Sequence, residues 1–403
     1  MRSKVWQDTA VTQGLITFLI LRIFLTLWAV LVLTIIPVPE TPDEVVRPYL
    51  GQPILSAGVS GKLFGPWQRF DTLHYTRIAD QNYVHEEDSV FPPLYPWAIR
   101  GLAFLFGGRH STQMAAGVLI ANLACLGLFI LFPKVVASEM GPDYSGRALL
   151  YFAIFPAAFF LLAPYSEALF LLFALASLWA ARRGHFAAAG ILGLLASFTR
   201  LTGWVLVIPL AYEFWRQRLR PVFSFQFSVF NNLSWRVIGE GAAVLLPGVG
   251  TFLFLVYRWA VGLPMLSHIY VEYWYQVTGI PGTDLLRALQ TMFLGGQARA
   301  GEFTLWFDFF CAILLLVTTA ITFKRIGITW GLYAAMMLFF MLLPVSDLKP
   351  LYSFSRYTLA FFPTFMLLSM WGKNSIVHRL ILYPSLILYL YFSGQFFIWG
   401  WVA

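Results

Sequence analysis

The sequence predicts an all-α protein that crosses a membrane many times. Hydrophobic residues make up 59% of the 403 residues, charged residues make up 11%, and the mean hydropathy is +0.72. A soluble domain carries about 25% charged residues, so this chain could not cover a water-facing surface. The hydrophobic residues fall into long runs with charged segments between them, which is typical of a bundle of membrane-spanning helices.

The charge pattern and the cysteines exclude several other classes of protein. The net charge of +8 is spread between the hydrophobic runs, which suits topology and contact with anionic lipids but not nucleic-acid binding. No Walker-type or strand-linked glycine-rich motif is present, so we expect no nucleotide cofactor. Cys125 and Cys311 lie within apolar runs, which argues against a disulfide framework.

Eleven hydrophobic runs are candidate membrane spans, because a spanning helix needs about 20 apolar residues and fewer where it is broken or re-entrant. They are residues 15–36, 114–132, 148–162, 168–181, 186–198, 202–212, 237–257, 305–323, 328–343, 357–371 and 376–399. The apolar run 97–106 is too short to cross, and we expect an interfacial helix there. No repeat or linker divides the chain, so residues 1–403 are predicted to form a single membrane domain.

The positive-inside rule orients these spans. Arg2 and Lys4, together with the basic loops after even-numbered runs, all fall inside when eleven spans are counted. A span at 97–106 would place the later basic loops outside. The segment 223–232 is then an inside connector. Two long segments, 37–113 and 262–304, lie outside together with two short ones, 163–167 and 344–356.

The first outer segment contains the leading candidate for a catalytic residue. Asp71 lies in the aromatic sequence Trp67-Gln-Arg-Phe-Asp-Thr-Leu-His-Tyr75, between Arg69 and Arg77. The segment is amphipathic, as an interfacial helix would be. A carboxylate held there can take a proton from an acceptor hydroxyl. A solvated loop aspartate explains the residue equally well.

Two further groups of acids lie in the predicted outer segments. The simplest interpretation of Glu86, Glu87 and Asp88 is that each lies in a solvated turn. The alternative is that one of them, Glu86, is a second acid near Asp71. His85 beside these acids lacks the spacing of a metal centre, so no metal site is predicted. Glu167 follows two prolines in a short outer turn, where it either complements a helix dipole or belongs to a site.

Basic residues on the same side provide candidate phosphate ligands. Arg200 interrupts the apolar stretch 186–212, which must turn back near it because both ends are predicted inside. An arginine there needs an anionic partner, either a lipid phosphate or Glu167. Arg356, at the start of the tenth run, either anchors a helix at the headgroups or binds phosphate with Lys349.

These motifs, in this order, resemble the PIG-V-like GPI alpha-mannosyltransferase II family of the GT-C glycosyltransferase superfamily. The first matches are Arg69-Phe-Asp71, Tyr83 and Phe91-Pro-Pro-Leu-Tyr-Pro96, and the later ones are Ala163-Pro-Tyr-Ser-Glu-Ala-Leu-Phe170, Thr199-Arg-Leu-Thr-Gly203 and Ser355-Arg-Tyr-Thr-Leu-Ala-Phe-Phe-Pro363. This chain departs from the family pattern at Phe70, where Trp is usual, and at Pro92, where a second Phe is usual.

The resemblance implies a GT-C bundle that transfers a sugar, by default mannose, with inversion from a polyprenyl-phosphate donor to a lipid or glycolipid acceptor. It implies Asp71 as general base and makes His74 and Tyr75, with Arg69 in the same motif, candidate substrate contacts. Arg200, Lys349 or Arg356 would then stabilise the leaving phosphate. The site would face the non-cytoplasmic side of a prokaryotic inner membrane or of the endoplasmic reticulum.

The alternative is a non-catalytic flippase or transporter of lipid-linked sugars or small solutes. Broken spans and intramembrane charges suit a transporter as well. A transporter would place its charges near the midplane in duplicated halves, whereas here the charges lie at one face and no repeat is evident. Transfer of the sugar to protein rather than lipid is a third possibility.

Overall fold

The computed structural model describes residues 2–220, 235–295 and 302–402, and it is mostly helical. Every predicted hydrophobic run contains helical structure. Among the described residues, four helices are long and apolar enough to span a membrane, or five if one bent pair counts as a single span. The chain is therefore a helical integral membrane protein, and the number eleven stays a prediction. The predicted connector 223–232 lies outside the described residues.

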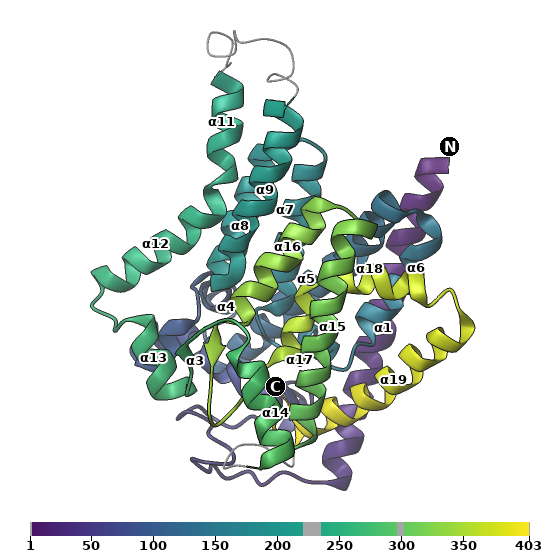
Figure 1. Ribbon diagram of the computed structural model, residues 1–403. Coiled ribbons are helices and arrows are strands. Elements are labelled where there is room, and N and C mark those ends of the chain that lie inside the picture. The colour runs from purple at the N-terminus through teal and green to yellow at the C-terminus, as the bar shows by residue number, and fades with distance from the viewer. Residues whose placement is uncertain (1, 221–234, 296–301, 403) are drawn as a thin grey trace.

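The bundle combines span-length helices with shorter ones (Figure 1). The span-length helices are α1 (Arg2–Ile35), α5 (His110–Met140), α15 (Phe303–Arg325), α19 (Ser375–Phe397) and the pair α11 (Trp235–Val244) and α12 (Leu246–Ala260), bent by 53°. The shorter ones are α6 (Pro142–Ala153), α7 (Glu167–Arg182), α8 (Phe186–Thr199), α9 (Val207–Phe214), α16 (Ile328–Met341) and α18 (Phe362–Trp371).

Short helices arise where prolines and charges interrupt the apolar sequence. Between α6 and α7 the chain carries Pro156 and Pro164 and forms only the 3₁₀ turn η3 (Ala158–Leu161). After α8 the backbone of Arg200 is extended, with φ of −147°, and the 3₁₀ helix η4 (Leu201–Leu206) follows. The break at Arg200 confirms the turn predicted there, because the helix cannot continue through an extended residue.

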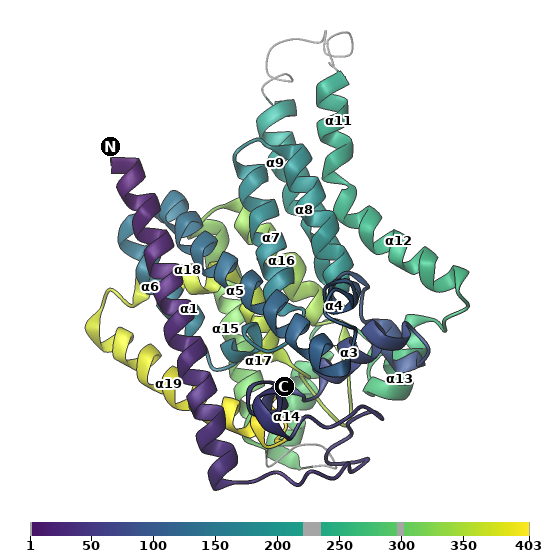
Figure 2. The same cartoon turned by 180° about the vertical axis from the view of Figure 1, so that it is seen from behind.

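Close packing ties the central helices together around a large aromatic and aliphatic core. Gly190 of α8 lies directly against the carbonyl oxygen of Ala243 in α11, and a Cβ there would collide with it. Small residues at such contacts let two membrane helices approach closely. Figure 2 shows α8 beside α7 and α9, with α11 and α12 along the outer side.

Basic residues that were predicted to lie inside form ion pairs at one end of the bundle. Arg182, at the end of α7, bonds Glu139 at 2.7 Å and Glu213 at 3.0 Å. Glu213 is fully buried and also accepts from Arg216 at 2.7 Å. These contacts join α5, α7 and α9 at the end of the molecule that also holds the N-terminus (Figure 1).

The two long segments that were predicted outside gather at the other end of the bundle (Figures 1 and 2). The first forms α2 (Gly58–Phe64), η1 (Gly65–Trp67), α3 (Asp71–Gln81), η2 (Glu86–Val90) and α4 (Leu94–Phe104). The second forms α13 (Leu266–Trp274), β1 (Val277–Thr278) and α14 (Thr283–Leu294). Helix α4 covers most of the short apolar run 97–106, which was predicted to be helical but too short to cross.

A two-stranded ladder, not predicted from the sequence, joins the second long segment to the segment before the tenth run. β1 pairs antiparallel with β2 (Pro344–Val345), placing Val277 opposite Val345. Asp284 of α14 reinforces this junction by accepting hydrogen bonds from the backbone N–H of Ser346 at 2.9 Å and of Leu351 at 2.5 Å. The chain then enters the short helix α17 (Phe354–Tyr357) and the 3₁₀ turn η7 (Thr358–Ala360).

Candidate functional site

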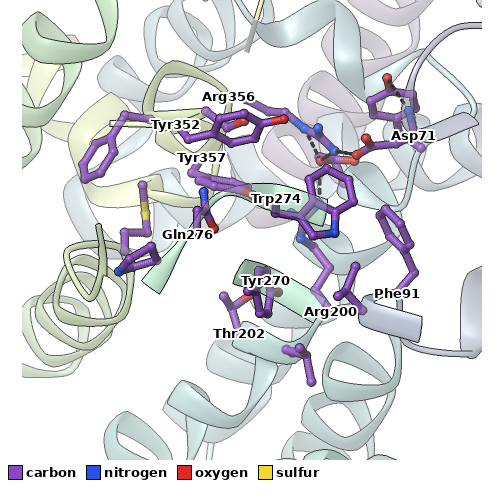
Figure 3. A pocket seen from close by; sticks show the side chains of 18 of the residues that line it. Asp71, Phe91, Arg200, Thr202, Tyr270, Trp274, Gln276, Tyr352, Arg356 and Tyr357 are labelled. Atoms are coloured by element: carbon purple, nitrogen blue, oxygen red, sulfur yellow. Dashed lines mark hydrogen bonds and ion pairs between the residues drawn. The ribbon is translucent and has the colours of Figure 1, made fainter. Parts of the chain in front are cut away.

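A cavity of about 790 Å³ lies where the outer segments meet the bundle. Its walls come from segments far apart in sequence, namely α3, the start of α7, the Arg200 turn, α13, β1, the end of α16 and α17. Most of the lining is apolar or aromatic, with charged groups drawn together at one place (Figure 3). A concave, largely apolar pocket with a few convergent polar groups is typical of a ligand site.

Four charged residues of the lining form one connected cluster of two carboxylates and two arginines, whereas Asp284 lies apart from it at the β1–β2 junction. Arg356 donates from Nη2 to Asp71 Oδ2 at 2.7 Å and from Nε to Glu167 Oε1 at 2.5 Å. Arg200 donates from Nη1 to the same Glu167 oxygen at 2.5 Å (Figure 3). Glu167 Oε2 is buried and has no hydrogen-bond partner within the described part of the chain. A buried charge is expected to be fully bonded, so this oxygen is available to a ligand.

The backbone before Asp71 is held in an uncommon conformation. Phe70 has φ of 47°, a region that costs energy for a bulky residue, and Asp71 begins α3 immediately after it. The Phe70 ring packs against the rings of Phe396 and Trp401, with centroid distances of 5.8 and 5.7 Å, and this packing fixes the turn. The Asp71 N–H donates to Tyr165 Oη at 3.2 Å. These contacts aim the Asp71 carboxylate at Arg356.

The other three charged residues each occupy the end of a helix. Glu167 is the first residue of α7, after the proline-containing turn, and Arg200 follows the last residue of α8. Arg356 lies in α17, with its guanidinium 4.9 Å from the Phe160 ring centroid and 4.7 Å from that of Tyr165. Broken helices therefore expose these side chains to one cavity, as discontinuous helices do in other membrane sites.

Two more of the predicted site residues line the cavity, both on α3. Tyr75 is buried, and its hydroxyl lies 2.6 Å from Ser166 Oγ. Burial, together with the negative charge of nearby Glu167, raises the pKa of the Tyr75 phenol, so it stays neutral. His74 stacks on Phe91 with ring centroids 5.2 Å apart.

The remaining predicted site residues lie outside the cavity lining. Arg69 is buried and donates from Nε and Nη2 to the Phe397 carbonyl oxygen at 3.1 and 2.9 Å, and burial lowers the pKa of Arg69 to about 10. Glu86 is exposed at the start of η2. Lys349 lies 4.3 Å from the Trp401 ring centroid. Arg69 therefore fastens the first outer segment to the end of α19.

The expectation of a solvated turn is wrong for Asp88. Its carboxylate is fully buried, accepts from Arg77 at 2.7 and 2.8 Å, and lies 2.6 Å from His74 Nδ1. Burial alone would raise the pKa of Asp88, but the hydrogen bonds from His74 and Arg77 outweigh it and hold the pKa below its ordinary value. No local sequence pattern signals this contact, because His74 lies on α3 and Asp88 lies fourteen residues later on η2.

Sequence reasoning also missed the aromatic residues of the second long segment. Tyr270 and Trp274, both on α13, line the cavity, and both are labelled in Figure 3. Their spacing of four residues on an amphipathic helix was the available signal. That signal does not say which side of the helix meets the bundle.

The fold and the cavity define an integral membrane protein with two arginines and two carboxylates gathered in a cavity at one end of a helical bundle. Residues 12–236 match the family described as "Mannosyltransferase (PIG-V)", more than half of the chain. The chain belongs to the PIG-V mannosyltransferase family. The matched range includes Asp71, Glu167 and Arg200, whereas Arg356 lies beyond it.

Individual relatives match over a shorter region. GPI alpha-1,6-mannosyltransferase 2 of Rattus norvegicus is 31% identical over 152 residues, which is 36% of this chain and 31% of the relative. The Homo sapiens protein of the same name is 30% identical over 152 residues, with the same two shares of 36% and 31%. The matching region thus spans about a third of the length of these relatives.

Two solved structures are similar at low identity. The oligosaccharyltransferase of Archaeoglobus fulgidus, tethered with an acceptor peptide, is 14% identical with a TM-score of 0.47, over 95% of this chain and 55% of that one. ArnT from Cupriavidus metallidurans, bound to undecaprenyl phosphate, is 15% identical with a TM-score of 0.42, over 82% of this chain and 71% of that one.

Proposed function

We propose that the protein is a GT-C type membrane glycosyltransferase that moves a sugar, most simply mannose, from a polyprenyl-phosphate donor to a hydroxyl of a lipid or glycolipid acceptor. The observation that carries this proposal is the bridge that Arg356 makes between Asp71 and Glu167, with Arg200 on the same Glu167 oxygen. A site with paired acids and paired arginines has both a proton acceptor and a phosphate ligand. Membership of the PIG-V family supports the choice of sugar.

The two arginines are the proposed ligands of the donor phosphate. Both now share the single carboxylate oxygen of Glu167, which holds them side by side at the cavity surface. A phosphate offers more charge and more acceptor oxygens than that one atom, and guanidinium groups bind it through charge-assisted bonds. The apolar residues of the cavity, among them Met337 and Phe340 of α16, provide a surface for the first prenyl units.

Asp71 is the proposed general base for an inverting, single-displacement transfer. The acceptor oxygen attacks the anomeric carbon, its proton passes to Asp71, and the bond from that carbon to the phosphate oxygen breaks. The released lipid phosphate keeps the electron pair of that bond as an anion, which Arg200 and Arg356 stabilise. Asp71 Oδ2 is engaged by Arg356, so movement of this arginine toward the phosphate would free the carboxylate.

The test uses detergent-purified protein with a synthetic polyprenyl-phosphate mannose and a glycolipid acceptor extracted from the source membrane. We expect mannosylated lipid and free polyprenyl phosphate in equal amounts, with inversion at the anomeric carbon seen by NMR. Donor that stays intact, while the protein moves it between the leaflets of a vesicle, would favour the flippase alternative. The leaflet in which the mannosylated lipid first appears would test the proposed non-cytoplasmic location of the site, in an inner membrane or the endoplasmic reticulum.

A further inference from the structure

We propose that Trp274, His74 and Glu167 form a hexose-binding subsite that holds the sugar ring of the donor beside Asp71. This inference rests on the proposed function and goes beyond it, because it names the residues that recognise the sugar rather than the phosphate. All three residues line the cavity, and they come from α13, α3 and α7.

Trp274 supplies an aromatic wall and an unused hydrogen-bond donor. Its ring centroid lies 5.8 Å from that of His74 and 5.9 Å from that of Phe91, and Figure 3 shows it among the labelled side chains of the cavity. The indole Nε1 is buried and has no partner among the residues that the structure describes. A buried indole N–H normally finds a partner, so the ligand-free cavity lacks an acceptor at this position.

His74 supplies an acceptor whose direction is set by Asp88. The Nδ1 atom lies 2.6 Å from the buried Asp88 carboxylate, which Arg77 also holds. A carboxylate at Nδ1 selects the tautomer that carries its proton there, which leaves a lone pair on Nε2. The side chain is 15% exposed and lines the cavity, and within the described residues Nε2 meets no protein partner.

The chemistry of these groups selects a hexose over the other parts of the donor. A sugar ring presents a face of C–H bonds to the negative face of an aromatic ring and hydroxyl groups around its edge. Its hydroxyls can both accept from Trp274 Nε1 and donate to His74 Nε2 or to the unpartnered Glu167 Oε2. A prenyl chain needs none of these polar atoms, and a fully ionised phosphate has no proton to donate to His74 Nε2 or to Glu167 Oε2.

Arg258 of α12 fixes the position of α13, which carries Trp274, relative to the segment of Asp88, which orients His74. Its guanidinium donates to the carbonyl oxygen of Ser89, the neighbour of Asp88, and to that of Pro264 at 2.6 Å, just before α13. At the other end of α13, Tyr275 takes a left-handed conformation with φ of 56°, and the Gln276 N–H bonds the Tyr270 carbonyl at 2.9 Å. The chain then enters the β1–β2 ladder, so α13 is fastened at both ends.

The test measures how much the sugar adds to lipid binding, without any acceptor present. Dissociation constants are measured for synthetic polyprenyl phosphate and for polyprenyl-phosphate mannose on the full-length purified protein. We expect the parent to bind the mannose-bearing lipid about tenfold more tightly, which corresponds to about 1.4 kcal/mol. We call the dissociation constant of the bare lipid divided by that of the mannose-bearing lipid the sugar ratio. In Trp274→Leu the sugar ratio should fall below about threefold while binding of the bare lipid persists.

Two further variants separate the contributions within the subsite. Trp274→Phe keeps an aromatic face without the N–H and should give an intermediate ratio. Trp97→Leu removes a tryptophan that is 45% exposed on α4 and outside the cavity, and should leave the ratio unchanged. Thermal unfolding of each variant checks that the fold is retained.

Asp88 is a positioning residue in this proposal, since it acts through His74. Asp88→Asn should lower the sugar ratio and leave the affinity for bare polyprenyl phosphate near the parental value. The matched control is Glu87→Gln, because Glu87 bonds the same Arg77 at 2.7 Å but does not contact His74. Equal effects of the two variants, or equal loss of both lipids in Asp88→Asn, would leave Asp88 with only a structural role and remove His74 from the subsite.

The outcomes distinguish this inference from the proposed function. Equal affinity of the parent for the two lipids overturns the subsite, while binding of the bare lipid still supports a phosphate site. A sugar ratio that Trp274→Leu leaves unchanged, or a variant that weakens both lipids alike, also overturns it. A parent that binds neither lipid overturns the proposed function and the subsite together.

Discussion

Arg356 Nη2 and Asp71 Oδ2 are 2.7 Å apart, although 285 positions separate the two residues in the chain. Asp71 is the first residue of α3, and Arg356 lies just before the tenth hydrophobic run. Their contact joins the proposed base to the proposed phosphate ligand.

Replacing Asp71 by Asn should slow sugar transfer while donor binding persists. The amide keeps the size of the side chain but cannot take a proton, and a positioned general base contributes roughly 10²–10⁴-fold in rate. Initial rates at saturating donor measure the effect. Asp80→Asn is the matched control, since Asp80 is exposed on the same helix and lies outside the cavity. Transfer at the parental rate in Asp71→Asn would move the base to Glu167.

Replacing Arg200 by Ala should weaken donor binding more than it destabilises the protein. Hydrogen bonds to charged groups contribute about 1.5–3 kcal/mol, so we expect a loss of affinity of about 10- to 100-fold. Arg200→Lys should recover only part of it, because an ammonium cannot make a bidentate contact. The exposed Arg109, at the same end of the molecule, gives the control Arg109→Ala. Unchanged donor affinity in a folded Arg200→Ala protein would leave Arg200 as a structural partner of Glu167.

The predicted orientation places the two ends of the bundle on opposite sides of the membrane. Arg183 follows α7 at the end that holds the N-terminus, and Gly282 precedes α14 at the end that holds the cavity. A reporter fused after Arg183 should therefore be inside, and one fused after Gly282 should be outside. Both reporters on one side would exclude the orientation and the location assigned to the site.

Acid should destabilise the protein through Asp88. Its pKa is lowered in the folded state by His74 and Arg77, so the unfolded chain binds this proton more readily. The contribution of Asp88 is therefore complete above the ordinary aspartate pKa, about 4, and is lost as the pH falls toward the lowered value. Unfolding temperatures in detergent between neutral and acidic pH measure this loss.

Asp88→Asn should flatten that part of the pH profile, because the variant no longer titrates there. The exposed Asp143, replaced by Asn, serves as the control for loss of one carboxylate. A parental profile in Asp88→Asn would show that other acids govern the response.

The apolar runs of this chain identify the helices well, because hydrophobic length is a local property of the sequence. The broken helix at Arg200 was also predictable, since two basic ends on one side force the short stretch 186–212 to turn back. In the same way, Asp71, Glu167, Arg200 and Arg356 were each found as charges that an apolar environment makes costly.

Their pairing required the tertiary structure. The sequence offered Glu167 as one possible partner of Arg200 and phosphate as another, and it predicted no direct contact between Arg356 and Asp71. The roles of Asp88 and Trp274 depend on contacts across 14 positions and between separate outer segments, and no local pattern encodes such contacts.

Local hydrophobicity and charge therefore predicted a helical membrane protein with the acids and bases of its candidate site near one surface. Packing decided which of these charges meet. Arg69 donates to the Phe397 carbonyl oxygen, whereas Arg356 donates to both Asp71 and Glu167. A buried charge must find a partner wherever the folded chain brings one, and that partner is determined by distance in space rather than by position in the sequence.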